Sequence, residues 1–366
     1  MLRPKVLFLL AIGLLLAASP MLAANYTVGT CKPSLPSYTT ISGAVSSVPP
    51  GSTVEVCPGT YAEQVMIAQP LTLKGITSGN AGQAVITIPL GGLLAVISGE
   101  GYTIAPQVDV TAGPVNISDI TVDGTGSNLG NPTWTVGILY DTGSSGTVNK
   151  VTVRSINNSE HQSVGVWAEN ASSTNESVTI QNSSFHDIDQ SAVFTLGLTL
   201  TATVKGNTME TSGTDVQWGS GGSITGNIIN GGFLGISVGG PVTVSGNTLA
   251  NQNLGIEAFG GVTATSNKIS NTPFAGIYDE GGGNTYKLNT ITKAGVGIEF
   301  ACFTPTVVSN TINDATTGLD HVPASFSSAN SFNNVVTLRS GGCGFGPIRG
   351  PKLPAQPSGP MRAPAH

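Results

Sequence analysis

The chain has 366 residues, and its 14 basic and 20 acidic side chains give it a formal net charge of −6. Charged residues make up only 9% of the sequence, whereas ordinary globular chains contain about 25%. A nucleic-acid-binding protein needs a basic surface, which this composition excludes. The low charge and the 49 glycines instead favour a β-structure with neutral polar faces.

Residues 1–24 have the pattern of a secretory signal peptide. Arg3 and Lys5 precede an apolar run over residues 6–18, and Ala23 is a small residue suited to cleavage. The apolar run is too short to span a bilayer comfortably, although a retained membrane anchor is the alternative. We therefore expect a secreted protein, extracellular or periplasmic, with no stable membrane span.

Residues 38–48 form the predicted helix. Thr39 or Thr40 can cap its N-terminus, and Pro49-Pro50-Gly51 ends it. An apolar stripe so close to the first strands is expected to cover the open end of a solenoid. The stripe consists of Ile41, Ala44, Val45 and Val48.

A repeat of about 20 to 22 residues runs from about Thr203 to Phe332. Within each copy apolar residues alternate with a period of two, and small or amide-bearing residues separate three short strands. A small residue followed by an aliphatic one recurs, as in Gly255-Ile256. An asparagine also marks each copy, at Asn207, Asn227, Asn247, Asn267, Asn289, Asn310 and Asn330.

The repeat predicts an all-β solenoid of three-stranded coils that stack at about 4.8 Å. The aliphatic residue of each copy points inward. The recurring asparagines then stack at one corner, where their amides can form a hydrogen-bonded ladder.

Coils such as Gly246-Asn247-Thr248-Leu249 resemble those of right-handed parallel β-helix proteins of the pectin-lyase-like superfamily, including the NosD-type proteins. The resemblance covers roughly residues 38–337 and implies a right-handed parallel β-helix. Residues 59–63, Gly-Thr-Tyr-Ala-Glu, and the cap around them also resemble the pectin methylesterases, but the later motifs of those enzymes are missing. This fold carries lyases, hydrolases, esterases, epimerases and adhesive proteins, so the resemblance does not imply one activity.

We expect one monomeric β-helix domain over residues 25–343, followed by a disordered tail rich in proline and glycine over residues 344–366. Four cysteines in an exported chain indicate two disulfides, Cys31–Cys57 and Cys302–Cys343. The second pair is about two coils, or roughly 10 Å, apart in regular stacking, which exceeds bridging distance. Its formation requires the glycine-rich end to fold back, and free thiols are the alternative.

Candidate site residues follow the inward aliphatic of each coil and point outward. One half of this row is aromatic, with Trp167, Phe194 and the nearby Trp218; Gln217 follows. The other half is acidic. It contains Glu257, Tyr278, Glu280, Glu299 and Asp320. Aromatic rings stack on sugar faces and carboxylates bind hydroxyl groups, so the row predicts a polysaccharide site over Trp167, Phe194, Gln217, Trp218, Tyr278 and Glu280.

Two functions remain open. The first is polysaccharide binding without turnover, or a purely structural or adhesive surface role. The second is a polysaccharide hydrolase or lyase that uses Glu257, Glu299 and Asp320, because Glu299 and Asp320 lie on neighbouring coils at about the carboxylate spacing of retaining glycosidases. The motifs of polygalacturonases, pectate lyases and alginate epimerases are absent. We expect no cofactor and no metal, because neither a Ca²⁺ cluster nor a histidine pair at copper-ligand spacing is evident; a Ca²⁺ ion is the alternative, although no motif supports it.

Overall fold

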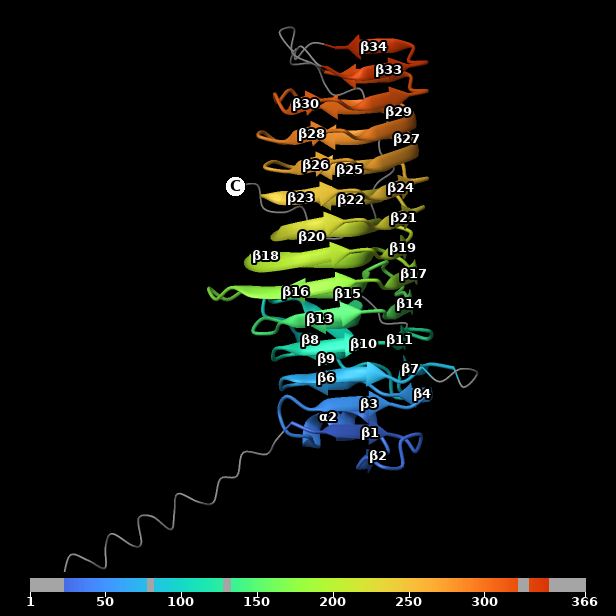
Figure 1. Ribbon diagram of the computed structural model, residues 1–366, viewed down its shortest axis with the longest axis vertical. Helices are drawn as coiled ribbons and strands as arrows, with labels where there is room; N and C mark the ends of the chain where they lie inside the picture. Colours follow the sequence, from blue (N-terminus) through green and yellow to red (C-terminus); the bar gives the residue numbers. More distant parts are fainter. Residues whose placement is uncertain (1–22, 78–81, 128–132, 322–328, 342–366) are drawn as a thin grey trace, which may run out of the picture.

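The computed structural model describes residues 23–77, 82–127, 133–321 and 329–341. The chain winds into a tall column of stacked coils, with helix α2 (Ile41–Ser47) at its N-terminal end (Figure 1). Its strands join into one hydrogen-bonded system in which neighbouring strands are parallel. The pairing of β8 with β9 is the antiparallel exception among the described strands. The predicted all-β architecture of three-stranded coils is confirmed. The predicted tail and nearly all of the predicted signal peptide lie outside the described residues.

Each coil contributes to three sheets that run the length of the column. The first sheet carries the candidate site. It consists of β5 (Val65–Ile67), β9 (Thr103–Val110), β12 (Trp134–Tyr140), β15 (Ser163–Glu169), β18 (Ser191–Lys205), β20 (Thr214–Thr225), β22 (Leu234–Val238), β25 (Leu254–Ala258), β27 (Lys268–Asp279), β29 (Thr290–Phe300), β32 (Thr317–Asp320) and β34 (Thr337–Ser340).

The second sheet includes the C-terminal parts of β18 and β20, because these two long strands continue through a corner. β2 (Ser37–Tyr38) pairs with its first strand, β1. The sheet consists further of β1 (Asn25–Val28), β3 (Thr53–Val56), β6 (Leu71–Gly75), β10 (Val115–Ser118), β13 (Gly146–Asn149), β16 (Glu176–Gln181), β23 (Val242–Ser245), β26 (Thr263–Thr265), β28 (Thr285–Lys287) and β30 (Thr306–Val308).

The third sheet includes the N-terminal parts of β27 and β29. β8 (Val96–Ile97) lies outside the three sheets and pairs with the start of β9. The third sheet consists further of β4 (Gly59–Ala62), β7 (Ala84–Thr87), β11 (Ile120–Asp123), β14 (Thr152–Ile156), β17 (Ser184–Ile188), β19 (Thr208–Glu210), β21 (Ile228–Asn230), β24 (Thr248–Ala250), β31 (Thr311–Asn313) and β33 (Ser331–Asn333).

The interior of the column is filled by aliphatic side chains in register. Ile236, Ile256, Ile277 and Ile298 pair directly across successive strands and are buried. The residue before each of them must be small, because a Cβ on Gly255 would lie 2.4 Å from the carbonyl oxygen of Gly276. This close approach explains the recurring glycine that precedes the aliphatic residue.

The predicted asparagine ladder is present as a continuous hydrogen-bonded column. The Asn247 Nδ2 donates to the Asn267 Oδ1 at 3.0 Å and to the backbone oxygen of Ile224 at 2.9 Å. The Asn267 Oδ1 also accepts from the backbone N–H of Asn247 at 3.0 Å. The same bonds link Asn207, Asn227, Asn247, Asn267, Asn289, Asn310 and Asn330.

Helix α2 is shorter than predicted, because Ser37 and Tyr38 extend to pair with β1 instead of entering the helix. The Thr40 side chain caps the helix by accepting from the Gly43 N–H at 3.1 Å. Glu63 of the Gly-Thr-Tyr-Ala-Glu stretch accepts the N–H groups of Ile41 and Ser42 at 3.0 and 2.8 Å. Glu63 therefore has a structural role in fixing the cap.

Cys31 and Cys57 form a disulfide with a Cα–Cα distance of 5.7 Å, next to the cap. Cys302 is exposed. Cys343 lies outside the described residues, so the Cys302–Cys343 pairing stays a prediction. Among the residues that the structure describes, no helix is long and apolar enough to cross a membrane.

Candidate functional site

The predicted outward row exists as directly paired residues of the first sheet. Pairing places Trp167 opposite Phe194, Gln217 opposite Ser237, and Glu299 opposite Asp320. The row also begins before Trp167, because Met66 of β5 pairs with Asp109 of β9, and Asp109 pairs with Leu139 of β12. In register, the row runs through Met66, Asp109, Leu139, Trp167, Phe194, Gln217, Ser237, Glu257, Tyr278, Glu299, Asp320 and Ser340.

The prediction of an exposed aromatic platform is wrong. Trp167 is 0% exposed and Phe194 is 4% exposed. The segment that carries β8 folds back over this part of the sheet, and the ring of Tyr102 lies 5.5 Å from that of Trp167. Trp134 also packs edge-on against Trp167 at 5.4 Å. The aromatic half of the row is therefore a second small core and cannot stack on a sugar.

Trp218 is also misplaced in the prediction. It pairs with Val238, whose side chain lies in the central core, and Trp218 itself is buried there. Its indole N–H donates to the backbone oxygen of Ser220. Because neighbouring strand residues face opposite sides, Trp218 points inward where Gln217 points outward. Gln217 remains partly exposed.

A cluster of buried carboxyl groups lies beside the covered aromatic residues. The Glu169 Oε2 accepts from the Trp167 Nε1 at 2.9 Å and from the Ser98 Oγ at 3.1 Å. The Asp141 Oδ1 accepts from the Gly99 N–H at 2.8 Å. Burial, together with the nearby Asp141, raises the pKa of Glu169 to about 7 and that of Asp109 to about 6. Glu169 and Asp141, through their hydrogen bonds to Ser98, Gly99 and Glu100, hold the covering segment in place.

Asp141 and Glu169 lie two residues after Leu139 and Trp167, so strand alternation alone places them on the outward face. Asp109 was missed because the step back from Leu139 to Asp109 is 30 residues, longer than the repeat. The alternation of inward Val108 and Val110 around Asp109 is the signal that could have located it.

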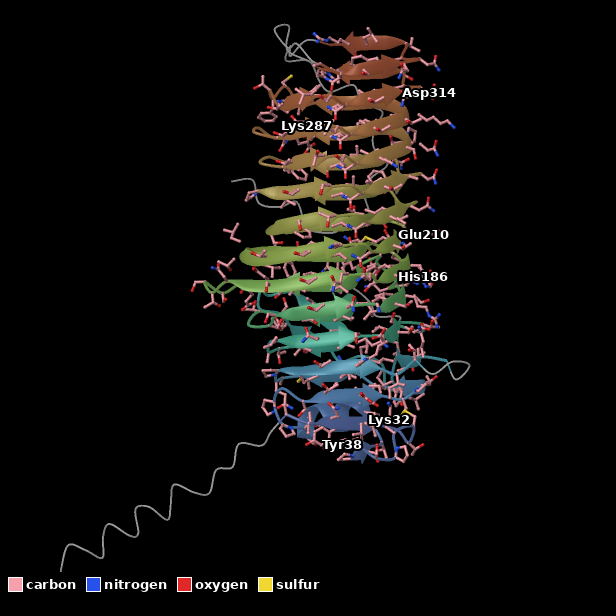
Figure 2. The ribbon with its side chains drawn as sticks, viewed as in Figure 1. Lys32, Tyr38, His186, Glu210, Lys287 and Asp314 are labelled. Atoms are coloured by element: carbon pink, nitrogen blue, oxygen red, sulfur yellow. A yellow bond between two sulfur atoms is a disulfide. The ribbon has the colours of Figure 1, made fainter. Side chains whose placement is uncertain are left out.

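The acidic half of the row is more open. The Glu257 carboxylate accepts from the Ser237 Oγ at 2.9 Å, and Glu257 and Glu280 are both partly exposed. Phe259, two residues after Glu257, is 39% exposed and offers an accessible ring at the end of its strand. Figure 2 shows Glu210 and Asp314 along a different edge of the column, the edge formed by the third sheet.

Tyr278 is buried among these acids. It packs edge-on against Phe274 at 5.9 Å and joins a small apolar cluster with Leu234 and Leu254. Burial raises the pKa of Tyr278, and the negative charges of Glu280, Glu299 and Glu257 raise it further. The phenol therefore stays protonated and lies at the centre of the acidic half.

Glu299, Asp320 and His321 converge at the C-terminal end of the row. The His321 Nδ1 lies 3.5 Å from the Asp320 Oδ2 and 3.9 Å from the Glu299 Oε1. Ligand atoms of the three residues all lie within 4.8 Å of one another. Glu299 is only 3% exposed, so burial raises its pKa; the charge of Asp320 adds to this effect and His321 opposes it.

A family model described as a right handed beta helix region matches residues 136–291 of the chain. The A-module of mannuronan C-5 epimerase AlgE4 from Azotobacter vinelandii is similar in structure, with a TM-score of 0.51 and 16% identity over 83% of this chain and 93% of that module. The GH136 lacto-N-biosidase from Eubacterium ramulus is similar at a TM-score of 0.51 and 9% identity, over 87% of this chain and 67% of that chain.

No curated protein sequence matches the chain at a significant level. At these low identities the structural similarities establish the fold alone. The family match covers the central coils, and the sheets described above continue the same coils in both directions. The chain therefore has the right-handed parallel β-helix fold.

Proposed function

We propose that this protein binds a polysaccharide along the acidic half of the outward row. The proposal rests mainly on one observation, the direct pairing of polar residues on successive coils. Gln217, Ser237, Glu257, Tyr278, Glu299 and Asp320 follow one another across six strands, which at about 4.8 Å per strand span about 24 Å. Tyr278 and Glu299 are buried, whereas the other four are partly exposed, so a polymer with repeating hydroxyl groups meets these four polar side chains along one line.

The chemistry of the row also fits a sugar polymer. Carboxylates and a hydroxyl group supply hydrogen bonds, and the exposed ring of Phe259 offers an apolar surface to a sugar face. Both similar structures reported above are named for enzymes of carbohydrate chemistry, an epimerase acting on mannuronan and a lacto-N-biosidase. Export, as the N-terminal sequence predicts, would bring the protein to extracellular or envelope polysaccharides.

Binding can be tested with a panel of immobilised polysaccharides, neutral and anionic, and the purified protein. Retention on one polymer is expected, and Glu257→Gln together with Phe259→Ala should weaken it by about tenfold or more. Glu210→Gln is the matched control, because Glu210 is an exposed glutamate of the third sheet. Failure to retain any polymer, or equal loss with the control, would contradict the proposal.

Polymer cleavage is the second candidate function. It is favoured by the direct pairing of Glu299 with Asp320, which places two carboxyl groups at about the spacing of a retaining glycoside hydrolase. The same panel can be scored for new reducing ends and for unsaturated products. Product release that Glu299→Gln abolishes would establish turnover, whereas retention without product would support a binding protein.

A further inference from the structure

We propose that Glu299, Asp320 and His321 bind one divalent transition-metal ion, such as Zn²⁺ or Mn²⁺. This inference goes beyond polysaccharide binding, since it concerns a ligand that the outward row would hold even without a polymer. Two carboxylates and one imidazole form the donor set, and both donor types bind such ions.

The distances within the cluster suit a shared ion better than direct hydrogen bonds. The His321 Nδ1 lies 3.5 Å from one carboxylate oxygen and 3.9 Å from another, beyond the range of good hydrogen bonds. Around an ion with bonds of about 2.0–2.2 Å, neighbouring donor atoms are about 3.0–3.5 Å apart. Because the ligand atoms lie within 4.8 Å of one another, a contraction of less than about 2 Å would bring the donors to coordinating distance.

Asp320 is oriented in the way that metal-binding carboxylates commonly are. Its Oδ1 accepts from the backbone N–H of His321 at 2.8 Å and from the Ser340 hydroxyl group. Its Oδ2 lies on the side of the His321 imidazole. Hydrogen bonds from outer residues thus fix one oxygen and leave the other to face the proposed ion.

Glu299 provides an independent observation that points to a cation. Its side chain is more than nine-tenths buried, and its Oε1 faces the imidazole of His321. The Asp320 carboxylate belongs to the directly paired residue of the next strand, and a ligand oxygen of Asp320 lies within 4.8 Å of one of Glu299. Two neighbouring carboxylates, one of them on a buried side chain, are costly unless a cation compensates their charge, which the proposed ion would do.

The imidazole determines the class of ion. Ca²⁺ and Mg²⁺ prefer all-oxygen sites, whereas nitrogen donors favour first-row transition metals. Three protein ligands leave coordination positions for water or another ligand. We therefore expect Zn²⁺ to bind more tightly than Ca²⁺.

The test measures metal binding to the purified protein without an affinity tag, after treatment with a chelator and without any polysaccharide. Equilibrium dialysis with Zn²⁺, followed by elemental analysis, should give one tightly bound ion per chain. His321→Gly should weaken that binding by about tenfold to a hundredfold. Glycine is a suitable replacement because His321 has φ 56°, a left-handed conformation that glycine adopts without strain.

His161→Gly is the matched control. His161 has φ 55° and its imidazole lies 3.6 Å from the Asp189 carboxylate, but it belongs to no cluster of three metal-binding side chains in the described residues. This variant should bind Zn²⁺ like the unaltered protein. Glu299→Gln gives a second, independent removal of a ligand and should also weaken binding, with circular dichroism to verify folding.

Three results would overturn the metal site: no Zn²⁺ bound at stoichiometric level, equal binding by His321→Gly and His161→Gly, or tighter binding of Ca²⁺ than of Zn²⁺. Because the measurement contains no polymer, its outcome is independent of the retention assay. A failure to retain any polysaccharide would not contradict the metal site. A failure to bind Zn²⁺ would not contradict polysaccharide binding.

Discussion

At the scale of single residues, the outward face of the first sheet carries several carboxyl groups that folding removes from water. Asp109 and Glu169 lie under the covering segment, and Glu299 lies near the opposite end of the row. Burial disfavours the charged form of a carboxyl group, so the folded state binds its proton more tightly than the unfolded chain does. The stability of the protein must therefore depend on pH.

Asp109 offers a clear test of this dependence. Because burial raises its pKa from 3.8 to about 6, its contribution to stability is fully present below about pH 4 and is lost as pH rises through 6. Asp109→Asn removes this loss. We expect the variant to be more stable at pH 8 by up to about 3 kcal/mol and nearly unchanged at pH 4, as measured by urea unfolding. An equal change at both pH values would contradict the expectation.

The asparagine ladder gives a second prediction. In Asn247→Ala, the side-chain amide and the backbone N–H of Asn227 both lose their acceptor in a buried corner. Unsatisfied buried donors are costly, so we expect a loss of about 2–4 kcal/mol in the free energy of unfolding. Asn230→Ala is the control, because the bond between Asn230 and Asn251 is exposed. Similar losses in both variants would show that the buried ladder stabilises the fold no more than an exposed asparagine bond does.

At the scale of strands and coils, the sequence was sufficient to predict which residues share a row but not which rows are exposed. The repeat locates Gln217, Glu257 and Asp320 on one face because each coil adds nearly the same number of residues. Trp218 was assigned to the wrong side because a shift of one residue reverses the facing of a strand residue.

The cover over Trp167 could not be predicted from periodicity. It comes from residues between β8 and β9, where the chain leaves the regular coil, folds back and pairs in the antiparallel sense. The buried interactions of Glu169 with Ser98 and Glu100 span about 70 residues of sequence and have no counterpart in the repeat. The convergence of Glu299 on His321 likewise depends on side-chain conformations that spacing does not specify.

The glycine before each inward aliphatic residue gives a prediction at this scale. A Cβ on Gly255 would also lie 2.7 Å from the Ile269 Cγ2, besides its clash with the next coil. Gly255→Ala should therefore destabilise the protein by about 1–3 kcal/mol, as overpacking does. Gly239→Ala is the control, since its Cβ would meet Phe259 at an ordinary 3.5 Å. Equal thermal unfolding of the two variants would refute the steric explanation.

At the scale of the whole molecule, the column is almost one-dimensional, because each coil contacts mainly the coils before and after it (Figure 1). The stability of such an architecture is approximately the sum of the contributions of single coils and of the interfaces between neighbouring coils. A substitution that destabilises one end should therefore leave the other end folded. The N-terminal end is held by α2, Glu63 and the Cys31–Cys57 disulfide, within a few coils of the end.

Removal of this disulfide should therefore loosen one end only. In Cys31→Ser, we expect amide hydrogen exchange to accelerate in β1 and β3 by tenfold or more, because a closed loop of 26 residues contributes about 3 kcal/mol. Exchange in β25 and β29 should not change. Uniform acceleration along the column would show that the coils unfold as one unit.

The parallel pairing of strands within each of the three sheets also has a mechanical consequence. Hydrogen bonds between neighbouring coils point roughly along the column, so a pull on its two ends loads the coils in series. The chain would then lengthen by one coil at a time, each step releasing about 20 residues in the regular part of the repeat. A pull across the column would instead load many bonds together. The column should therefore resist force applied across its axis better than tension applied along it.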